Sequence, residues 1–473
     1  MAPYFTNNSC NPFLEPTAPC TLGNLAVYAV NATCTEDIAK TMDFVRRHNI
    51  RLTIRNTGHD YMGKAAGAGS LTIWTHYLNG MEVLNYNSSF YTGKALKMGP
   101  GVMNQDAFRF TQSHGLVNVG SNCQTVGVAG GYTQGGGHGP LGSKFGLAAD
   151  QALEWEVVTG TGEVLTARPD RNQDLYWALS GGGGGTYGVV TSLTVKTYPD
   201  LSTTASNLTF TSAGIDSAHY WDVVHTWIRS LPTLTGSGCW ASWVLTPGVF
   251  TLGPGTCPGK DREFMSDLLQ PTLSKLRQYN VSYNLSITEF PTFYDSYVEY
   301  NSPWNVSNAQ LGGRLIPKSL IEDNSTALLD VLRTYTDDFG LVVSGVTLNV
   351  SQAELPPGGN AVTPVWRTAV FDAVLGTAYN YSDYHANTVL ANDMTYKYLP
   401  MLERLTPGGG AYLNEADFQQ PDYKEVFYGG NYDRLLKIKE KYDPNQIFYA
   451  ITAVGSDRWY EDATRGGRLC RVH

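Results

Sequence analysis

Hydrophobic residues recur with helical or strand spacing through the first two hundred positions of the chain. Residues 36–48 place Ile38, Met42 and Val45 on one face of a helix, with acidic residues in its first turn and basic residues in its last. Alternating apolar positions predict short strands at 50–54, 70–77, 153–158 and 162–166. This mixture predicts small α+β layers.

The pattern changes after about residue 200. Helical spacing predicts helices at 217–229 and 261–279, and alternation predicts strands at 281–289, 341–350 and 363–375. Apolar residues that alternate with polar ones are typical of an antiparallel sheet with one covered face. We therefore expect an antiparallel sheet flanked by helices in this part of the chain. A last helix should begin near Tyr432 and end before Asp443-Pro444.

Two glycine-rich stretches interrupt the first part. Val119–Gly139 contains the lone cysteine Cys123, and Ile54–Gly63 contains His59. Such glycine density would destabilise a helix or strand, but it allows backbone to approach a ligand closely. Each stretch therefore surrounds one reactive side chain with backbone that can line a binding site.

Two matches to G-x-G-x-x-G lack the context of a dinucleotide fold. That motif has meaning when a hydrophobic strand enters it and a helix leaves it. The first match follows a glycine run and contains Pro140, and the second follows a predicted helix. We therefore reject NAD binding at Gly137, Gly139 and Gly142 and at Gly183, Gly185 and Gly188.

Four segments resemble the vanillyl-alcohol-oxidase-type (PCMH-type) flavoproteins, in their berberine-bridge-enzyme-like and oligosaccharide-oxidase branch. They are R-N-T-G-H-D at 55–60, C-Q-T-V-G-V at 123–128, the segment 172–190 and the segment 428–448. The resemblance implies a PCMH-type FAD-binding domain of two α/β subdomains plus a substrate domain. It divides the chain into an FAD-binding part at 1–204, a substrate-binding part at 205–405 and a C-terminal return at 406–473.

The same resemblance implies FAD attached through two covalent bonds. His59 matches the histidine that bonds to the flavin 8α-methyl group, and Cys123 matches the cysteine that bonds to flavin C6. The family pattern is not followed at Gln124, where proline is expected, nor at Ala129, which resembles an insertion. Further residues that the matched motifs assign to FAD are Arg55, Asn56, Thr57, Gly58, Asp60, Thr125, Val126, Gly130, Gly131, Gly136, Gly137, Gly188, Val189 and Asn414.

The catalytic residues are less well defined. Oligosaccharide oxidases carry Y-F-N-Y-A-D where this chain has Tyr412 to Asp417, and Glu415 replaces the second tyrosine, which is their base. Glu415 is either the base or a structural carboxylate paired with arginine. Tyr412 is a second candidate base, and Arg367, on the predicted 363–375 strand, is a candidate contact for an oxyanion or carboxylate.

The resemblance predicts an FAD-dependent oxidase that takes a hydride from an alcohol or an activated C–H bond. Val126 matches the position where oxygen-using members carry valine, which favours O2 as the acceptor and hydrogen peroxide as the product. The alternatives are an oligosaccharide (aldose) oxidase, an oxidative cyclase of a secondary metabolite, and a flavin-fold glycoprotein that binds a ligand without turnover.

Composition and charge limit the classes of partner that the protein can be expected to bind. The chain has 33 Lys and Arg against 42 Asp and Glu, a net charge of −9, and no basic cluster for nucleic acid. No apolar run reaches the roughly 18 residues of a membrane span. Neither H-E-x-x-H nor paired C-x-x-C occurs, so no metal site is predicted. We expect a monomer that acts on a small molecule.

Sequons and cysteines predict a secreted protein. Asn-X-Ser/Thr sites act only in the secretory pathway. With Cys123 tied to flavin, six cysteines remain, enough for three disulfides, and Cys239 and Cys257 form the expected local pair. The pairing of the other four stays open; three lie near the N-terminus and one near the C-terminus, so they would link the two ends. N-glycans are expected at Asn7, Asn31, Asn87, Asn207, Asn280, Asn284, Asn305, Asn324, Asn349 and Asn380.

Overall fold

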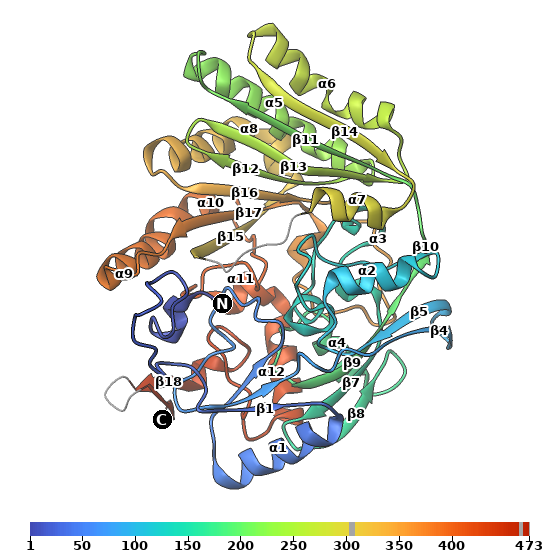
Figure 1. Cartoon of the computed structure of the whole chain (residues 1–473), viewed down its shortest axis with the longest axis vertical. Coiled ribbons are helices and arrows are strands. Elements are labelled where there is room, and N and C mark those ends of the chain that lie inside the picture. The colour runs from blue at the N-terminus through green and yellow to red at the C-terminus, as the bar shows by residue number, and fades with distance from the viewer. Residues whose placement is uncertain (302–307, 463–466, 473) are drawn as a thin grey trace.

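A computed structural model of the chain describes residues 1–301, 308–462 and 467–472 and confirms the α+β class. Its lower half in Figure 1 contains a parallel sheet of order β1-β3-β2 and an antiparallel sheet of order β4-β5-β9-β7-β8. The elements of this half are β1 (Tyr28–Asn31), α1 (Thr35–His48), β2 (Leu52–Arg55), β3 (Leu71–Trp74), β4 (Met81–Asn87), β5 (Thr92–Met98), α2 (Asn104–Gln112), β7 (Ala152–Thr159), β8 (Val164–Ala167), α4 (Gln173–Leu179) and β9 (Gly188–Lys196).

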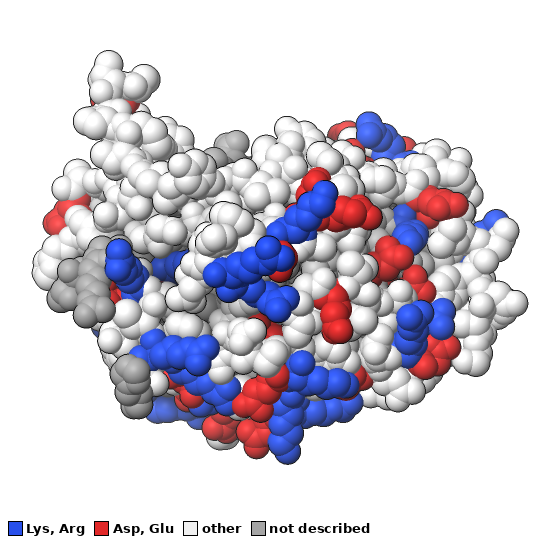
Figure 2. Space-filling model, turned by 90° about the horizontal axis from the view of Figure 1, so that it is seen from below, with Lys and Arg blue, Asp and Glu red and all other residues white. Residues whose placement is uncertain are grey.

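Helix α1 confirms the prediction from its apolar spacing. It buries Ile38, Met42 and Val45, and these side chains pack with residues of β2 and β3. The end of the molecule that carries α1 is drawn in Figure 2, where basic and acidic side chains lie next to one another. No helix among the described residues is long and apolar enough to cross a membrane.

The upper half is built on a seven-stranded antiparallel sheet of order β14-β11-β13-β12-β16-β17-β15. Helices cover one of its faces, as predicted, while the other face turns toward the lower half (Figure 1). The elements are β11 (Thr203–Thr211), α5 (Ser217–Gly236), β12 (Trp240–Thr246), β13 (Val249–Pro258), α6 (Arg262–Gln278), β14 (Tyr283–Phe290), α7 (Phe293–Tyr300), β15 (Ala309–Pro317), α8 (Lys318–Arg333), β16 (Val342–Thr347), β17 (Ala369–Ala378) and α9 (Tyr384–Asp393).

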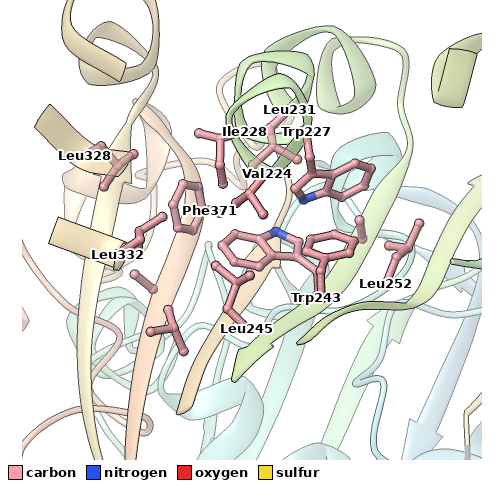
Figure 3. Close-up of a cluster of buried hydrophobic side chains, with 14 of the residues drawn as sticks. Val224, Trp227, Ile228, Leu231, Trp243, Leu245, Leu252, Leu328, Leu332 and Phe371 are labelled. Atoms are coloured by element: carbon pink, nitrogen blue, oxygen red, sulfur yellow. The ribbon is translucent and has the colours of Figure 1, made fainter. Parts of the chain in front are cut away.

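Tryptophan side chains fill the space between the helices and this sheet. Trp227 of α5 lies edge-on to Phe250, and Trp243 of β12 packs against Phe371 of β17 (Figure 3). Large aromatic side chains bury much apolar surface each. This core packs the helices firmly against one face of the sheet. The opposite face can therefore hold its side chains in defined positions.

The strand predicted at 363–375 begins later than expected. Pro364 opens a 3₁₀ turn over Pro364–Arg367, because proline lacks the N–H that a central strand needs, and β17 starts at Ala369. Arg367 therefore lies on a turn and not on the strand.

The last part of the chain returns to the lower half. Helices α10 (Leu399–Leu405), α11 (Tyr423–Tyr428) and α12 (Tyr432–Tyr442) precede a hairpin of β18 (Trp459–Asp462) and β19 (Arg468–Arg471). Helix α12 ends at Tyr442, before Asp443-Pro444, as predicted. Side chains of α11 and α12 share one core with β5, β7 and β9.

The disulfides confirm the local pair Cys239–Cys257 and correct the rest of the prediction. Cys10 pairs with Cys20, a partner only ten residues away, so it is not available to link the termini. Cys34 and Cys470 are free, and the described residues therefore contain two disulfides and not three.

Candidate active site

A deep cleft opens where the glycine-rich loops of the lower half meet the seven-stranded sheet. Its walls come from residues 52–65, 121–138, 184–190, 412–415 and 448–450. A side chain at Gly313 on β15 would clash with the carbonyl oxygen of Glu415, so the sheet and the 412–415 segment are in close contact. The cleft is thus assembled from segments that are far apart in the sequence.

The first loop turns sharply around His59. The Asp60 carboxylate accepts the backbone N–H groups of Met62 and Ala65, and Gly58 takes a φ of +95°, which favours glycine. This turn directs His59 toward the second loop, where its Nε2 lies 2.7 Å from the hydroxyl of Thr125. Burial lowers the pKa of His59, so the imidazole is neutral at neutral pH.

Cys123 approaches the same hydroxyl. Its backbone N–H donates to Ser121 Oγ over 3.0 Å, and its Sγ lies 4.0 Å from Thr125 Oγ1. His59 and Cys123 come from loops more than sixty residues apart, yet both reach Thr125. The structure therefore brings the two predicted attachment points close to each other through Thr125, with His59 in the lining of the cleft.

Glycines form the floor of the cleft. A side chain at Gly127 or Gly130 would clash with the Asn56 amide, whereas one at Gly131 would meet no atom within 4 Å and would project into open space. Backbone therefore lines this floor, which lets a flat ligand lie directly against the chain.

Several polar groups in the cleft have no partner among the described residues. Asn56 Oδ1, Gln134 Oε1 and His138 Nδ1 are buried without a hydrogen bond. Lys64 is the one lysine or arginine among the described lining residues; burial lowers its pKa to about 8, partly opposed by Asp60. Unpaired polar atoms, one cation and a glycine floor fit a cofactor with a diphosphate and a flat, hydrogen-bonding ring system.

The roof of the cleft carries an acid–base cluster. Glu415 Oε2 lies 3.2 Å from Nε2 of His138, a side chain that is only 4% exposed. The Asn414 amide donates to the Tyr412 hydroxyl and to the Gly131 carbonyl, over 2.8 Å in each case. Burial, and secondarily the Glu415 charge, raises the pKa of Tyr412, so this phenol stays protonated. Asn414 thus links the roof to the glycine floor.

Asp372 of β17 extends this cluster into the sheet. It is fully buried, and neither of its carboxyl oxygens has a hydrogen-bond partner among the described residues. Burial and the Glu415 charge raise the pKa of Asp372 to about 8. Although burial alone would lower it, the charges of Glu415 and Asp372 raise the pKa of His138.

Most of the residues that the sequence assigned to the site lie around the cleft. Thr125 contacts His59 and Cys123 contacts Thr125, but neither Thr125 nor Cys123 is among the lining residues. Arg55, Gly136 and Gly137 are not among the lining residues. Arg55 ends β2, and Gly136 and Gly137 accept backbone hydrogen bonds from Ala149 and Ala148. The lining includes Asn56, Thr57, Gly58, His59, Asp60, Val126, Gly130, Gly131, Gly188, Val189, Tyr412, Asn414 and Glu415.

Arg367 is placed differently from the prediction. Its guanidinium forms two hydrogen bonds with Asp150, of 2.8 and 2.7 Å, and it does not line the cleft. Asp150 is fully buried and also accepts from Asn360 and from the Leu147 backbone. Arg367 therefore balances a buried carboxylate, and it is not among the residues that line the cleft.

The sequence assigned no role to some residues that the structure places at the cleft. His138 stands in the run G-G-G-H-G, where the family pattern leads us to expect tyrosine, and this departure is the one available signal. Asp372, which lies outside the lining, sits within an apolar strand and gave no signal. The other lining residues without an assigned role include Tyr61, Lys64 and Gln134.

Comparisons with known proteins agree with this geometry. Residues 26–168 match the family model described as FAD binding domain, and residues 411–455 match the one described as Berberine and berberine like. The FAD-linked oxidoreductase patO of Aspergillus clavatus is 47% identical over the whole of this chain and 83% of its own length.

Solved structures of flavoproteins share the fold of this chain. The crystal structure of the VAO-type flavoprotein MtVAO615 from Myceliophthora thermophila C1 has a TM-score of 0.93 at 38% identity, covering all of this chain and 87% of that one. Glucooligosaccharide oxidase from Acremonium strictum, described with 6-S-cysteinyl, 8α-N1-histidyl FAD, shares the fold at 18% identity, with a TM-score of 0.76 over 92% of each chain. The chain therefore belongs to the vanillyl-alcohol-oxidase-type flavoproteins with a berberine-like C-terminal segment, and it is an FAD-linked oxidoreductase.

Proposed function

We propose that the protein is a secreted oxidase with bicovalently bound FAD that oxidises a small neutral alcohol, or an activated C–H bond, and passes the electrons to O2. The observation that carries the proposal is the meeting of His59 and Cys123 at Thr125. Attachment at two positions on the dimethylbenzene ring of a flavin requires two reactive side chains close together beside the cleft.

His59 and Cys123 would hold the dimethylbenzene edge of the flavin, at the 8α-methyl group and at C6. Because Nε2 of His59 is engaged by Thr125, its Nδ1 is left for the bond, and the lowered pKa keeps the imidazole neutral. Lys64 is the cation that would face the diphosphate. When bound, FAD supplies the two-electron acceptor for a hydride.

Glu415 is the group we assign as the base. It lines the cleft, and its partner is His138 and not an arginine, which supports the base over the structural carboxylate. A base must lie within hydrogen-bond reach of the hydroxyl whose proton it takes. Tyr412 lies behind it at 2% exposure, so its phenol orients Asn414 and does not compete for the proton.

The charges in the cleft limit the substrate. The roof contributes the carboxyl group of Glu415, and Lys64 at the first loop is the one lysine or arginine among the described lining residues. A carboxylate substrate would meet repulsion at the roof, so neutral alcohols fit better. Val126 in the lining supports the assignment of O2 as acceptor.

Exposure of the sequons supports secretion. Asn305 lies outside the described residues; of the other nine sequon asparagines, eight are exposed and Asn349 is half-buried. Glycans can be attached only where the asparagine is accessible. A mass loss on treatment with peptide-N-glycosidase, after expression in a fungal host, would support glycosylation, and an unchanged mass would contradict it.

Anaerobic flavin bleaching tests the catalytic proposal. Neutral primary and secondary alcohols should bleach the bound flavin of the wild type, and admission of air should restore the colour with one peroxide per cycle. Glu415→Gln should slow bleaching by about 10²- to 10⁴-fold, the usual contribution of a general base. Glu425→Gln, at an exposed site on α11, is the matched control. Bleaching of Glu415→Gln at the wild-type rate would remove this base assignment.

A further inference from the structure

Lys439 of α12 carries a buried ammonium group that the proposed chemistry does not use. Its Nζ donates to the carbonyl oxygen of Phe448 over 2.7 Å, to Oδ2 of Asp443 over 2.9 Å and to the carbonyl oxygen of Thr186 over 3.1 Å. The side chains of Lys439 and Asp443 are 4% and 0% exposed. A lysine ammonium has three N–H donors, so every donor of this group is used.

Two of these acceptors belong to two different walls of the cleft. Thr186 lies within residues 184–190, the glycine wall, and Phe448 opens residues 448–450, the C-terminal wall. Lys439 itself is not among the described lining residues. The buried lysine therefore joins two walls of the cleft from outside it.

The glycine wall has little rigidity of its own. It begins within the glycine run 181–185, whose first, third and fifth residues have φ values of +116°, +102° and +63°. Glycine has more backbone freedom than any other residue, so such a run keeps one conformation only where other contacts hold it. Two N–H groups of the run donate to the Gln134 carbonyl, and the bond from Lys439 to Thr186 holds its C-terminal end.

Asp443 fixes the backbone at the start of the C-terminal wall. Its Oδ1 accepts the Ile447 N–H over 2.9 Å, and its Oδ2 accepts the Phe448 N–H over 3.0 Å. Phe448 also forms a parallel bridge with Leu52 of β2, the strand that leads into the first loop of the cleft. One buried ion pair thus reaches, directly or through Phe448, the backbone of three wall segments.

We propose that Lys439 is a positioning residue for the cofactor: its ion pair with Asp443 holds the glycine wall and the C-terminal wall at the separation that FAD requires, and so sets the affinity of the cleft for FAD. The proposal rests on the proposed function only in placing FAD in this cleft. Loss of the ammonium group deprives two buried carbonyl oxygens of this donor, so the walls are no longer held together. A site that is ordered before binding binds more tightly, because the ligand does not have to order it.

Titration of FAD into the apoprotein tests this role. In the His59→Ala and Cys123→Ala double variant, Lys439→Met should weaken FAD binding about tenfold, the effect of a cleft that is correctly assembled in roughly one molecule in ten. The dissociation constant is measured by calorimetry. If the wild type releases its flavin on denaturation, the wild-type apoprotein serves as the parent, so failure of the covalent assignment leaves this test intact.

Ile438→Ala is the matched control. Ile438 is buried on the same helix, next to Lys439, and its side chain has no hydrogen-bond donor. This variant should lower the Tm, because it leaves a cavity, but keep the FAD affinity within about twofold of the parent. Lys441→Met, which removes an exposed ion pair with Asp174, should change neither quantity. An unchanged FAD affinity in Lys439→Met, or an equal loss of affinity in Ile438→Ala, would overturn the proposal.

Hydrogen exchange gives a readout that needs no substitution at Lys439. The Ile447 N–H donates to Asp443, and Ile447 is not among the described lining residues. FAD binding to the parent should nevertheless slow exchange of this amide, because a ligand and the arrangement that favours its binding stabilise each other reciprocally. Unchanged exchange at Ile447 would overturn the proposal even if Lys439→Met does not fold. A parent that binds no FAD would instead reject the cleft as the cofactor site, and with it the proposed function.

Discussion

His59 and Thr125 are joined by a hydrogen bond of 2.7 Å between Nε2 and Oγ1, and this bond connects the two glycine-rich loops of the cleft. It fixes the orientation of the imidazole before any cofactor arrives. A histidine held in one orientation, and kept neutral by burial, is suited to form a bond through its remaining nitrogen.

Single substitutions at the two attachment points should not release the flavin. After acid precipitation, about one FAD mass should stay with wild type, with His59→Ala and with Cys123→Ala, because either bond alone retains the cofactor. The double variant should give a colourless pellet. Intact mass and absorbance make the measurement, and Cys34→Ala, which removes another free cysteine, is the control. Colourless pellets from wild-type protein would reject covalent attachment.

Lys64 should contribute to non-covalent FAD binding. In the His59→Ala and Cys123→Ala double variant, Lys64→Met should weaken FAD binding about tenfold or more, since hydrogen bonds to charged groups contribute about 1.5–3 kcal/mol. The binding affinities of the apoprotein for FAD, AMP and flavin mononucleotide are measured by calorimetric titration. Lys64→Arg should recover most of the affinity. Lys437→Met, at an exposed site on α12, should change nothing, and equal affinities for all three variants would contradict the assignment.

Asp372 should make the folded protein less stable as pH rises. Its pKa is raised from 3.8 to about 8, so between these values the folded state holds a proton that the unfolded state has released. Stability from this group is therefore complete below about pH 4, falls across that window, and is constant above it. The Tm of wild type should drop more between pH 5 and pH 8 than the Tm of Asp372→Asn. Parallel curves would show that Asp372 is ionised in the fold.

Arg367 should matter for stability and not for chemistry. Asp150 is fully buried, so Arg367→Leu leaves an unpaired carboxylate, a change that typically costs about 3–5 kcal/mol. Chemical denaturation should show this loss, while the folded fraction should bleach its flavin at the wild-type rate. Arg367→Leu combined with Asp150→Asn should recover part of the stability. Slower bleaching with unchanged stability would restore the sequence-based assignment of Arg367 as a catalytic contact.

The sequence predicted the elements whose pattern is local. Helix α1 follows from the spacing of Ile38, Met42 and Val45, and the end of α12 follows from Asp443-Pro444. The pair Cys239–Cys257 also followed from its short separation. In each case the deciding residues lie within one or two turns of chain, or at the ends of one hairpin.

Contacts between residues that are far apart in the sequence could not be predicted from such local patterns. The raised pKa of Asp372 depends on burial between β15 and β16, and neighbouring residues in the sequence give no sign of this burial. Arg367 was assigned a catalytic contact because it lay on an expected strand. Pro364 replaces the start of that strand with a turn, and the Arg367 side chain pairs with Asp150, more than two hundred residues away in the sequence. Partners that meet only in three dimensions cannot be read from a periodic pattern.

The walls of the cleft come from segments that are far apart in the sequence, so the cleft can be completed only late in the synthesis of the chain. The first loop is complete by residue 65, but Glu415 and residues 448–450, which close the cleft, follow it in the chain by about three hundred and fifty residues or more. Contacts between such distant segments form late in folding. We therefore expect flavin loading to follow the synthesis of residues 448–450, and a product truncated after the seven-stranded sheet to remain without its cofactor.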